Sequence, residues 1–311
     1  MHYHTGLLLA FFAAFGYTLA TFFFKAAVVR GATGMQLNLW ANVALAVVAF
    51  ALAAVVFAVR ALNVESLGMF ETSAVSSTPF YLPILMGATL FCGQVCVFFA
   101  LARGDVSVIT PLLGTKIVMI AALNWLIFAI PAGWHLWMAA AFATLGVAVI
   151  TGIVPQASKK SSLATGGLAL AAAFFIALAD TFVENWAGGS DPFIFVPTAF
   201  ATMAVLSVAL CAVLDPSAFR IKKEFRFPLA CGAVLLGVES TCVFLGIALS
   251  RAAAAVGIVY SLRSLLTVVA AWFIGRYFGL NEQSLPRKIL LVRLVGALLL
   301  FAAIFLIFKQ K

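Results

Sequence analysis

The chain has 311 residues, of which 65% are hydrophobic and only 9% charged, and its mean hydropathy is +1.17. Because soluble proteins carry roughly 25% charged residues, this composition excludes a soluble enzyme and predicts that most of the surface faces lipid. The net charge of +9 does not indicate nucleic-acid binding, since the Lys and Arg residues stand in short gaps between apolar runs.

Ten apolar runs follow one another, each long enough to cross a hydrocarbon core of about 30 Å as a helix. We expect membrane-spanning helices at residues 6–24, 35–59, 81–102, 106–128, 134–154, 163–185, 192–214, 228–250, 252–275 and 289–308. The connections are rich in Gly, Pro or charged residues, and none is long enough to fold as a separate domain. The sequence therefore predicts an all-α integral membrane protein with its functional residues in or beside the helix bundle.

The distribution of cations predicts the orientation. Connections after odd-numbered runs carry twelve Lys and Arg residues, and the connections and terminus on the other side carry four. Loop cations tend to remain in the cytoplasm, so this count predicts a multi-pass protein of the cell (inner) membrane with both termini outside.

The two halves of the chain resemble one another. Residues 13–15 in the first run match residues 172–174 in the sixth, and Gln94 in the third run matches Glu239 in the eighth. The matches recur in order with small insertions, as expected of an internal repeat.

Each half contains five runs, an odd number, so two copies cross the membrane in opposite senses. The sequence therefore predicts two inverted five-helix repeats, residues 1–155 and 156–311, within one bundle. Such repeats place a shared cavity near the middle of the membrane.

Several motifs resemble a known family. They are Ala100-Leu101-x-Arg103 with the following Thr110-Pro111, the counterpart Ala248-Leu249-Ser250-Arg251, and Arg293-x-x-Gly296-Ala297-Leu298. With ten short spans in two halves, they are similar to the EamA-like branch of the drug/metabolite transporter superfamily. The resemblance implies transport by alternating access, through a cavity lined by spans one, three, four, six, eight and nine. Members of this family usually keep their termini in the cytoplasm, opposite to the charge count.

Ionisable residues inside spans are functional-site hypotheses, because each costs at least about 2.5 kcal/mol near the bilayer centre. Lys116 lies near the middle of the fourth run, and Arg263 has the matching position in the ninth. Glu239 lies in the middle of the eighth run, and Asp180 lies in the sixth. The alternative, structural interpretation is that each cation only neutralises a buried acid or binds helix carbonyls.

Two cations against one certain midplane acid favour a solute with an acidic group. We expect the substrate-binding residues to be Lys116, Arg263, Glu239, Gln94, Tyr260, Asp180 and Tyr17. Glu239 and Asp180 are also candidates to carry a coupling proton. Gly114, Gly257 and Pro111 stand next to the two cations and are candidate hinges of broken helices.

These features predict a secondary transporter, an exporter or exchanger, of a small amino-acid-like or anionic metabolite. An uptake permease or a nucleotide-sugar/triose-phosphate-type antiporter is the alternative. An enzyme or a scaffold is least favoured, because the sequence has no catalytic motif or Walker loop. We expect no cofactor, no metal and no nucleic-acid partner; the partners are the small-molecule substrate, the lipid bilayer and a coupled proton or counter-substrate, for a monomer or homodimer.

Overall fold

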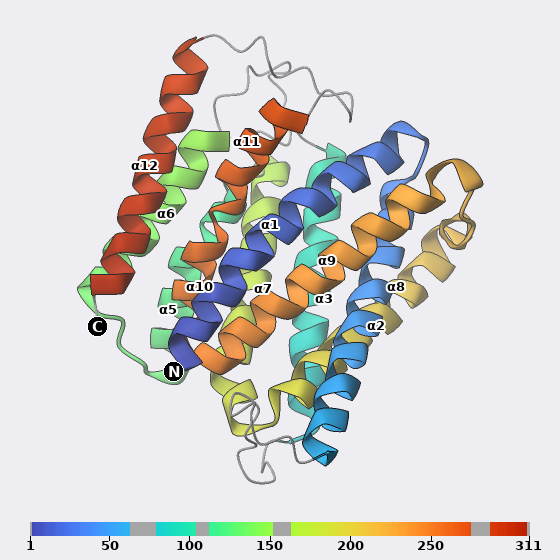
Figure 1. Cartoon of the computed structure of the whole chain (residues 1–311), viewed down its shortest axis with the longest axis horizontal. Coiled ribbons are helices and arrows are strands. Elements are labelled where there is room, and N and C mark those ends of the chain that lie inside the picture. Colours follow the sequence, from blue (N-terminus) through green and yellow to red (C-terminus); the bar gives the residue numbers. More distant parts are fainter. Residues whose placement is uncertain (1, 63–78, 104–111, 152–162, 275–286, 310–311) are drawn as a thin grey trace. The chain divides into compact units, whose positions relative to one another are not determined.

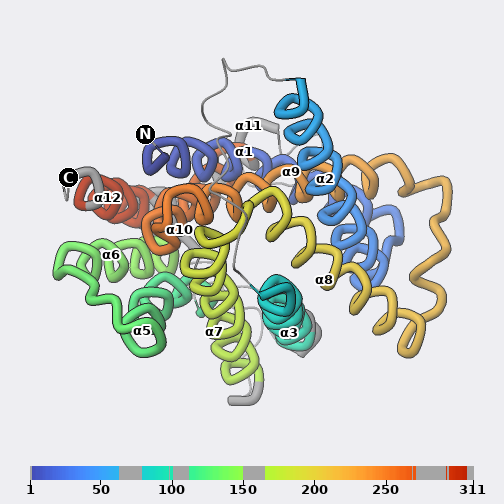
Figure 2. The backbone as a smooth tube through the Cα atoms, turned by 90° about the horizontal axis from the view of Figure 1, so that it is seen from below, coloured from blue at the N-terminus to red at the C-terminus, as the bar shows by residue number. Residues whose placement is uncertain are grey.

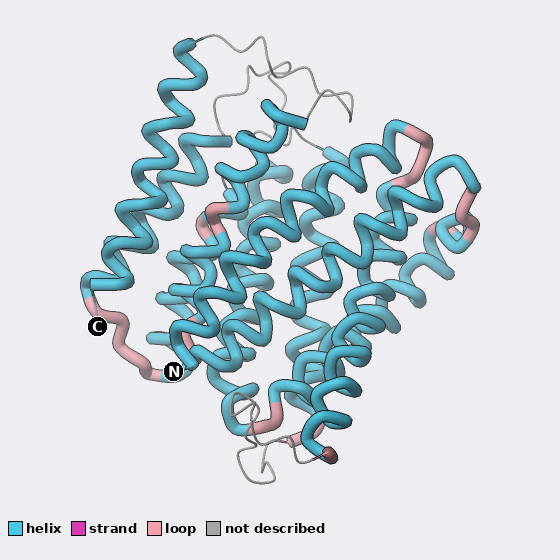
Figure 3. The backbone as a smooth tube through the Cα atoms, in the orientation of Figure 1, coloured by secondary structure: helices cyan, strands magenta, loops and turns pink. Residues whose placement is uncertain are grey.

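The computed structural model describes residues 2–62, 79–103, 112–151, 163–274 and 287–309. Within these ranges the regular structure is helical and no strand occurs (Figure 3). The helices, of which Figure 1 labels the α-helices, are α1 His2–Val29, α2 Gly34–Ala61, α3 Tyr81–Arg103, α5 Lys116–Phe128, α6 Trp134–Thr151, α7 Leu163–Trp186, η2 Ala187–Gly189, α8 Pro192–Leu214, η3 Pro216–Phe219, α9 Lys223–Ser250, α10 Ala253–Tyr260, α11 Arg263–Ile274 and α12 Arg287–Lys309.

Among the described residues, five helical segments are long and apolar enough to cross a membrane. They are His2–Val29, Gly34–Ala61, Thr165–Gly189, Pro192–Leu214 and Lys223–Ser250. Shorter apolar helical segments lie at Tyr81–Val97, Leu112–Phe128, Trp134–Val149, Ala253–Thr267 and Leu294–Leu306. The expectation of an all-α fold of membrane type is thereby met, while the count of ten spans and the inverted repeat remain predictions.

Helix ends fall at the breakers that the sequence contains. Gly31, in the turn after α1, adopts a positive φ of 96°. Glycine adopts this conformation at little cost because it has no Cβ. Thr33 then caps α2: its hydroxyl accepts from the Gln36 N–H at 3.2 Å, and the Gln36 side chain accepts from the Thr33 N–H at 2.9 Å. Asp191 caps α8, with Pro192 in the first turn.

Some helices extend beyond the apolar runs. The eighth run was expected to begin at Pro228, but α9 begins at Lys223. Apolarity identifies only the part of a helix that suits hydrocarbon, whereas backbone hydrogen bonds continue into the polar ends. Pro228 has no N–H to donate to the Glu224 carbonyl, four residues earlier. The Arg30 guanidinium donates to that carbonyl at 3.5 Å.

The chain divides into two compact units. Unit 1 is Met1–Phe91 with Phe182–Ala252, and unit 2 is Cys92–Thr181 with Ala253–Lys311. Each unit draws on both halves of the sequence, and α3 and α7 each begin in one unit and end in the other.

Unit 1 is organised around α1 and α9, which lie side by side in antiparallel directions (Figure 1). Small residues allow the close approach. A Cβ at Gly6 would lie 2.5 Å from the Gly246 carbonyl oxygen, and a Cβ at Gly16 would lie 3.1 Å from the Cβ of Glu239. Helix α2 packs on α8 and α9, where the buried Asn42 amide donates to Asn38 at 3.0 Å and to Ser207 at 2.6 Å.

Unit 2 contains the pair α6 and α12, which lie against each other in both views (Figure 2). A Cβ at Gly146 would lie 2.8 Å from the Gly296 carbonyl oxygen and 3.0 Å from Leu300, so a small residue sets this contact. Helix α5 packs on α6 and on α10. This packing holds together the broken fourth and ninth runs, which carry the candidate site.

The close contact between α1 and α9 generates a prediction about stability. Replacing Gly6 by Ala places a methyl group against the backbone of Gly246 and the Cβ of Ser250, which cannot rotate away. We expect a loss of about 1–3 kcal/mol, the usual cost of overpacking. Thermal unfolding of the purified protein in detergent measures it.

Gly166→Ala is the matched control, because no atom of the described part of the chain lies within 4 Å of a Cβ at that position. It should leave the melting temperature unchanged or raise it, since Ala favours helix over Gly. Equal melting temperatures for the two variants would contradict the close approach of α1 and α9 at Gly6.

Candidate functional site

The fourth apolar run is interrupted directly before Lys116. Residues 112–114 are helical, Thr115 forms a turn, and α5 begins at Lys116. At the turn the Thr115 N–H bonds to the Leu112 carbonyl at 3.1 Å, a spacing of three residues instead of four. The Thr115 hydroxyl also donates to Leu112, at 2.6 Å, and the Thr144 hydroxyl donates to the Gly114 carbonyl at 3.2 Å. Side-chain hydroxyls thus bond carbonyls at the interruption.

The ninth run is interrupted in the same way directly before Arg263. Helix α10 ends at Tyr260 and α11 begins at Arg263. The Leu262 N–H bonds to Val259, three residues back, at 3.1 Å, and the Ser261 hydroxyl donates to the Ile258 carbonyl at 2.6 Å.

The expected hinges can be compared with these two interruptions. The first interruption, at Thr115, directly follows Gly114, whereas Gly257 lies inside α10 and its carbonyl accepts a regular helical bond from the Ser261 N–H at 3.0 Å. Pro111, the third expected hinge, lies outside the described residues. Each cation is therefore the first residue of a helix that follows a break.

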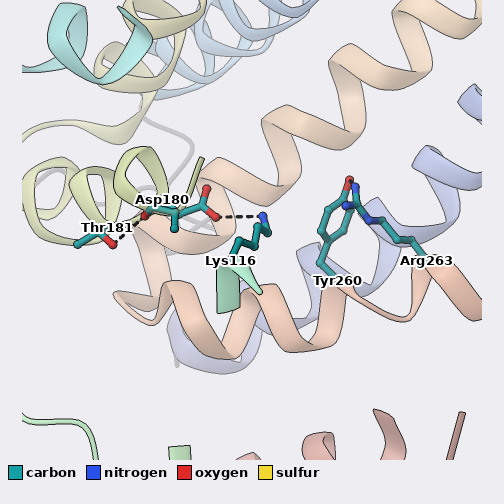
Figure 4. A network of polar contacts seen from close by, with 6 residues as sticks. Lys116, Asp180, Thr181, Tyr260 and Arg263 are labelled. Atoms are coloured by element: carbon teal, nitrogen blue, oxygen red, sulfur yellow. Dashed lines mark hydrogen bonds and ion pairs between the residues drawn. The ribbon is translucent and has the colours of Figure 1, made fainter. Parts of the chain in front are cut away.

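Lys116 forms an ion pair with Asp180 of α7. The ammonium nitrogen lies 3.1 Å from Oδ2 of Asp180 (Figure 4). The Asp180 side chain is 3% exposed and that of Lys116 is 15% exposed. A carboxylate removed from water to this degree needs a counter-charge, and Lys116 supplies it. Part of the structural interpretation is therefore correct, because Lys116 does neutralise a buried acid.

Tyr260 stands between the two cations. Its hydroxyl accepts from Nη1 of Arg263 at 2.8 Å, and the guanidinium carbon lies 4.3 Å from the ring centroid. The Lys116 ammonium lies 6.0 Å from the centroid of the same ring (Figure 4). Tyr260 and Arg263 are three residues apart in the sequence and meet across the second helix break.

Four of the seven predicted site residues therefore meet within unit 2. Asp180, Lys116, Tyr260 and Arg263 form a continuous series, which we call the polar cluster. Its side chains come from α7, α5, α10 and α11. The cluster contains two cations and one carboxylate, so it is a place where a second negative group is electrostatically favoured.

The other predicted residues have different surroundings. Gln94 is partly exposed on α3, in unit 2. Glu239 and Tyr17 belong to unit 1, where Glu239 is 3% exposed and its Oε1 accepts from the Ser240 hydroxyl at 3.2 Å. The participation of these three in one site with the polar cluster stays a prediction.

Sequence reasoning missed an ion pair in unit 1. Arg60, near the end of α2, bonds to the Asp191 carboxylate, and its guanidinium lies 5.3 Å from the Phe57 ring and 5.4 Å from the Phe193 ring. The Asp191-Pro192 dipeptide is typical of a helix start, but nothing in the local sequence indicates that Asp191 bonds to Arg60 on another helix. Among the described residues, no three His, Cys, Asp or Glu side chains are grouped so as to hold a metal ion.

Comparison with known proteins supports the fold and leaves the activity open. No protein-family model matches the chain, and no curated protein sequence matches it. The crystal structure of another protein is similar over 97% of this chain and 96% of that one, with a TM-score of 0.70 and 15% sequence identity. At that identity the likeness shows a shared fold alone.

The ion pair generates a prediction about stability. Lys116→Met leaves the Asp180 carboxylate buried without its cation, and Asp180→Asn leaves the ammonium without its acid. Each variant should lose about 3–5 kcal/mol, because one buried charge is left uncompensated. Unfolding in a series of denaturing detergent concentrations measures the loss.

The double variant Lys116→Met with Asp180→Asn completes a double-mutant cycle, which measures the coupling between the two groups. It contains neither charge, so we expect it to lose less than either single variant does. Additive losses would show that the two groups are not coupled in the folded protein.

Proposed function

We propose that this protein is a secondary transporter of the EamA-like kind that moves a small organic solute with an acidic group, either an amino acid or an anionic metabolite. Lys116 and Arg263 contact the acidic group. The observation that carries the proposal is the polar cluster, in which two cations flank Tyr260 at two helix breaks, opposite one carboxylate.

The helix breaks favour a binding role for the cations. A helix that only spans lipid gains nothing from an interruption, because every backbone group must then be satisfied in another way. Here α5 and α11 begin at Lys116 and Arg263, so the positive end of each helix lies at a cation. In transporters, discontinuous helices direct such ends toward anionic groups of the substrate.

The predicted inverted repeat supports alternating access. Residue matching makes Gly16 equivalent to Phe175 and Glu239 equivalent to Gln94. Gly16 lies against Glu239 in the α1–α9 contact, and Phe175 lies 3.2 Å from a Cβ built on Gly93, the neighbour of Gln94. At this one point α7 therefore approaches α3 at the position where the matching residues of α1 and α9 meet.

Other contacts follow this exchange of halves. Gly237 of α9 lies against Ala44 of α2, and Gly87 of α3 lies against Ala199 of α8. The two breaks, at Thr115 and before Arg263, also occupy matching positions. These correspondences are what two inverted copies would produce, and they support transport by exchange between two equivalent conformations.

The experiment is uptake into proteoliposomes. Labelled amino acids and the labelled carboxylates pyruvate and succinate are tested with and without a pH gradient. We expect at least one to enter faster than into protein-free liposomes. Lys116→Met and Arg263→Met should each reduce the rate at least about tenfold, the effect of losing about 1.4 kcal/mol of binding to one charged group.

Lys222→Met is the control, because Lys222 is an exposed cation at the start of α9 and its side chain makes no capping hydrogen bond. It should transport at the unaltered rate. Equal uptake with and without protein for the whole panel would contradict the transport proposal. Normal transport by both cation variants would show instead that the two cations are structural.

A further inference from the structure

The two members of the Lys116–Asp180 pair differ in access. The Lys116 side chain is 15% exposed, while that of Asp180, whose carboxylate lies beside the ammonium group (Figure 4), is only 3% exposed. An anion that approaches the polar cluster therefore meets Lys116 first. The acidic group of the solute and the Asp180 carboxylate would then bind the same ammonium.

We infer that Asp180 is an internal competitor of the solute for Lys116, and that it takes up a proton when the acidic group of the solute binds, so that anion and proton move together. This inference rests on the proposed function. It adds that the coupled ion is a proton and that the proton moves in the same direction as the solute. It assigns the solute class as a carboxylate whose charge is balanced by one proton.

The charges in the polar cluster support a coupling between solute binding and protonation of Asp180. With Asp180 ionised and no solute, the cluster holds two cations and one anion. Protonating Asp180 in the empty site leaves two cations without a counter-charge, which is costly at low dielectric. With a bound carboxylate, an ionised Asp180 would be a second anion on the same ammonium, and protonation of Asp180 removes the repulsion between the two carboxylates. Proton and anion each favour the binding of the other, as linkage requires.

The charged groups around Asp180 are those that a change in its protonation state would affect. Among the residues that the structure describes, Lys116 of α5 and Arg263 of α11 are charged groups that act on it, and Tyr260 of α10 contacts both cations. On α7 itself, Glu184 is one helical turn further along. A proton on Asp180 removes the charge that Lys116 now compensates and frees the ammonium for a ligand.

The test is the pH dependence of pyruvate binding to the purified full-length protein, measured by calorimetry in detergent from about pH 5.5 to about pH 8, where pyruvate stays ionised. If one proton is taken up, the dissociation constant should rise up to about tenfold per pH unit. Titrations in two buffers with different ionisation enthalpies should show about one proton taken up per pyruvate bound.

Asp180→Asn is permanently neutral at this position and imitates the protonated state. It should bind pyruvate with the low-pH affinity of the unaltered protein throughout, with no pH slope and no proton uptake. Asp180→Glu, which keeps a carboxyl group, should retain the slope. Glu224→Gln, a change at an exposed acid in the first turn of α9, should also retain it. If Asp180→Asn does not fold, the buffer-dependent proton count of the unaltered protein still decides whether a proton is taken up, and a count of zero overturns the inference.

The outcomes separate the two proposals. Pyruvate binding that depends on Lys116 but shows no proton uptake, or that keeps its pH slope in Asp180→Asn, would overturn this inference and leave the proposed transporter intact. Absence of pyruvate binding to the unaltered protein, together with equal uptake of the whole panel in empty liposomes, would overturn the proposed function itself.

Discussion

Backbone hydrogen bonding away from water is the constraint on which this structure depends. In a chain that is 65% hydrophobic, N–H and C=O groups must find partners within the protein, and the helix provides them locally. Where a helix is interrupted, side chains take over. Hydroxyl groups of Thr115, Thr144 and Ser261 bond carbonyls at the two breaks, and Arg30 bonds the carbonyl that Pro228 leaves without its partner.

The same constraint explains why small residues form the helix contacts. Lipid chains are as apolar as Leu, so burial of apolar surface adds little drive to helix association, and close van der Waals contact becomes decisive. Gly6 and Gly16 of α1 meet α9 closely, and Gly146 of α6 meets α12 closely. Close packing of this kind provides rigid elements on which a few polar groups can be held in fixed positions.

In the polar cluster, rigid helices allow charged groups to be buried. A buried carboxylate and a nearby guanidinium carry large desolvation costs, which hydrogen bonds and opposite charges offset only when their geometry is good. The Lys116–Asp180 pair at 3.1 Å and the Arg263–Tyr260 bond at 2.8 Å provide that geometry. A group able to compete for one of these bonds changes the charge balance of the whole cluster. Binding and protonation are therefore expected to be linked.

The sequence by itself determined the helical class, the positions of most helix ends and the presence of costly charges, because these follow from composition, apolar run length and local capping. Thr33 with Gln36 and Asp191 with Pro192 are local signals of this kind. Tyr260 and Arg263 are also close in sequence, only three residues apart, although the helix is interrupted between them.

Only the tertiary structure decided which groups are partners across helices. Nothing in the spacing of Lys116 and Asp180, 64 residues apart, shows that they meet, nor that Arg60 bonds to Asp191. Periodicity assigns a side chain to a face of its helix, but the packing of small residues decides which other helix that face meets. The exact positions of the breaks at Thr115 and Leu262 likewise depend on packing, because the cost of a lost helical bond is offset by partners such as Thr144 on another helix.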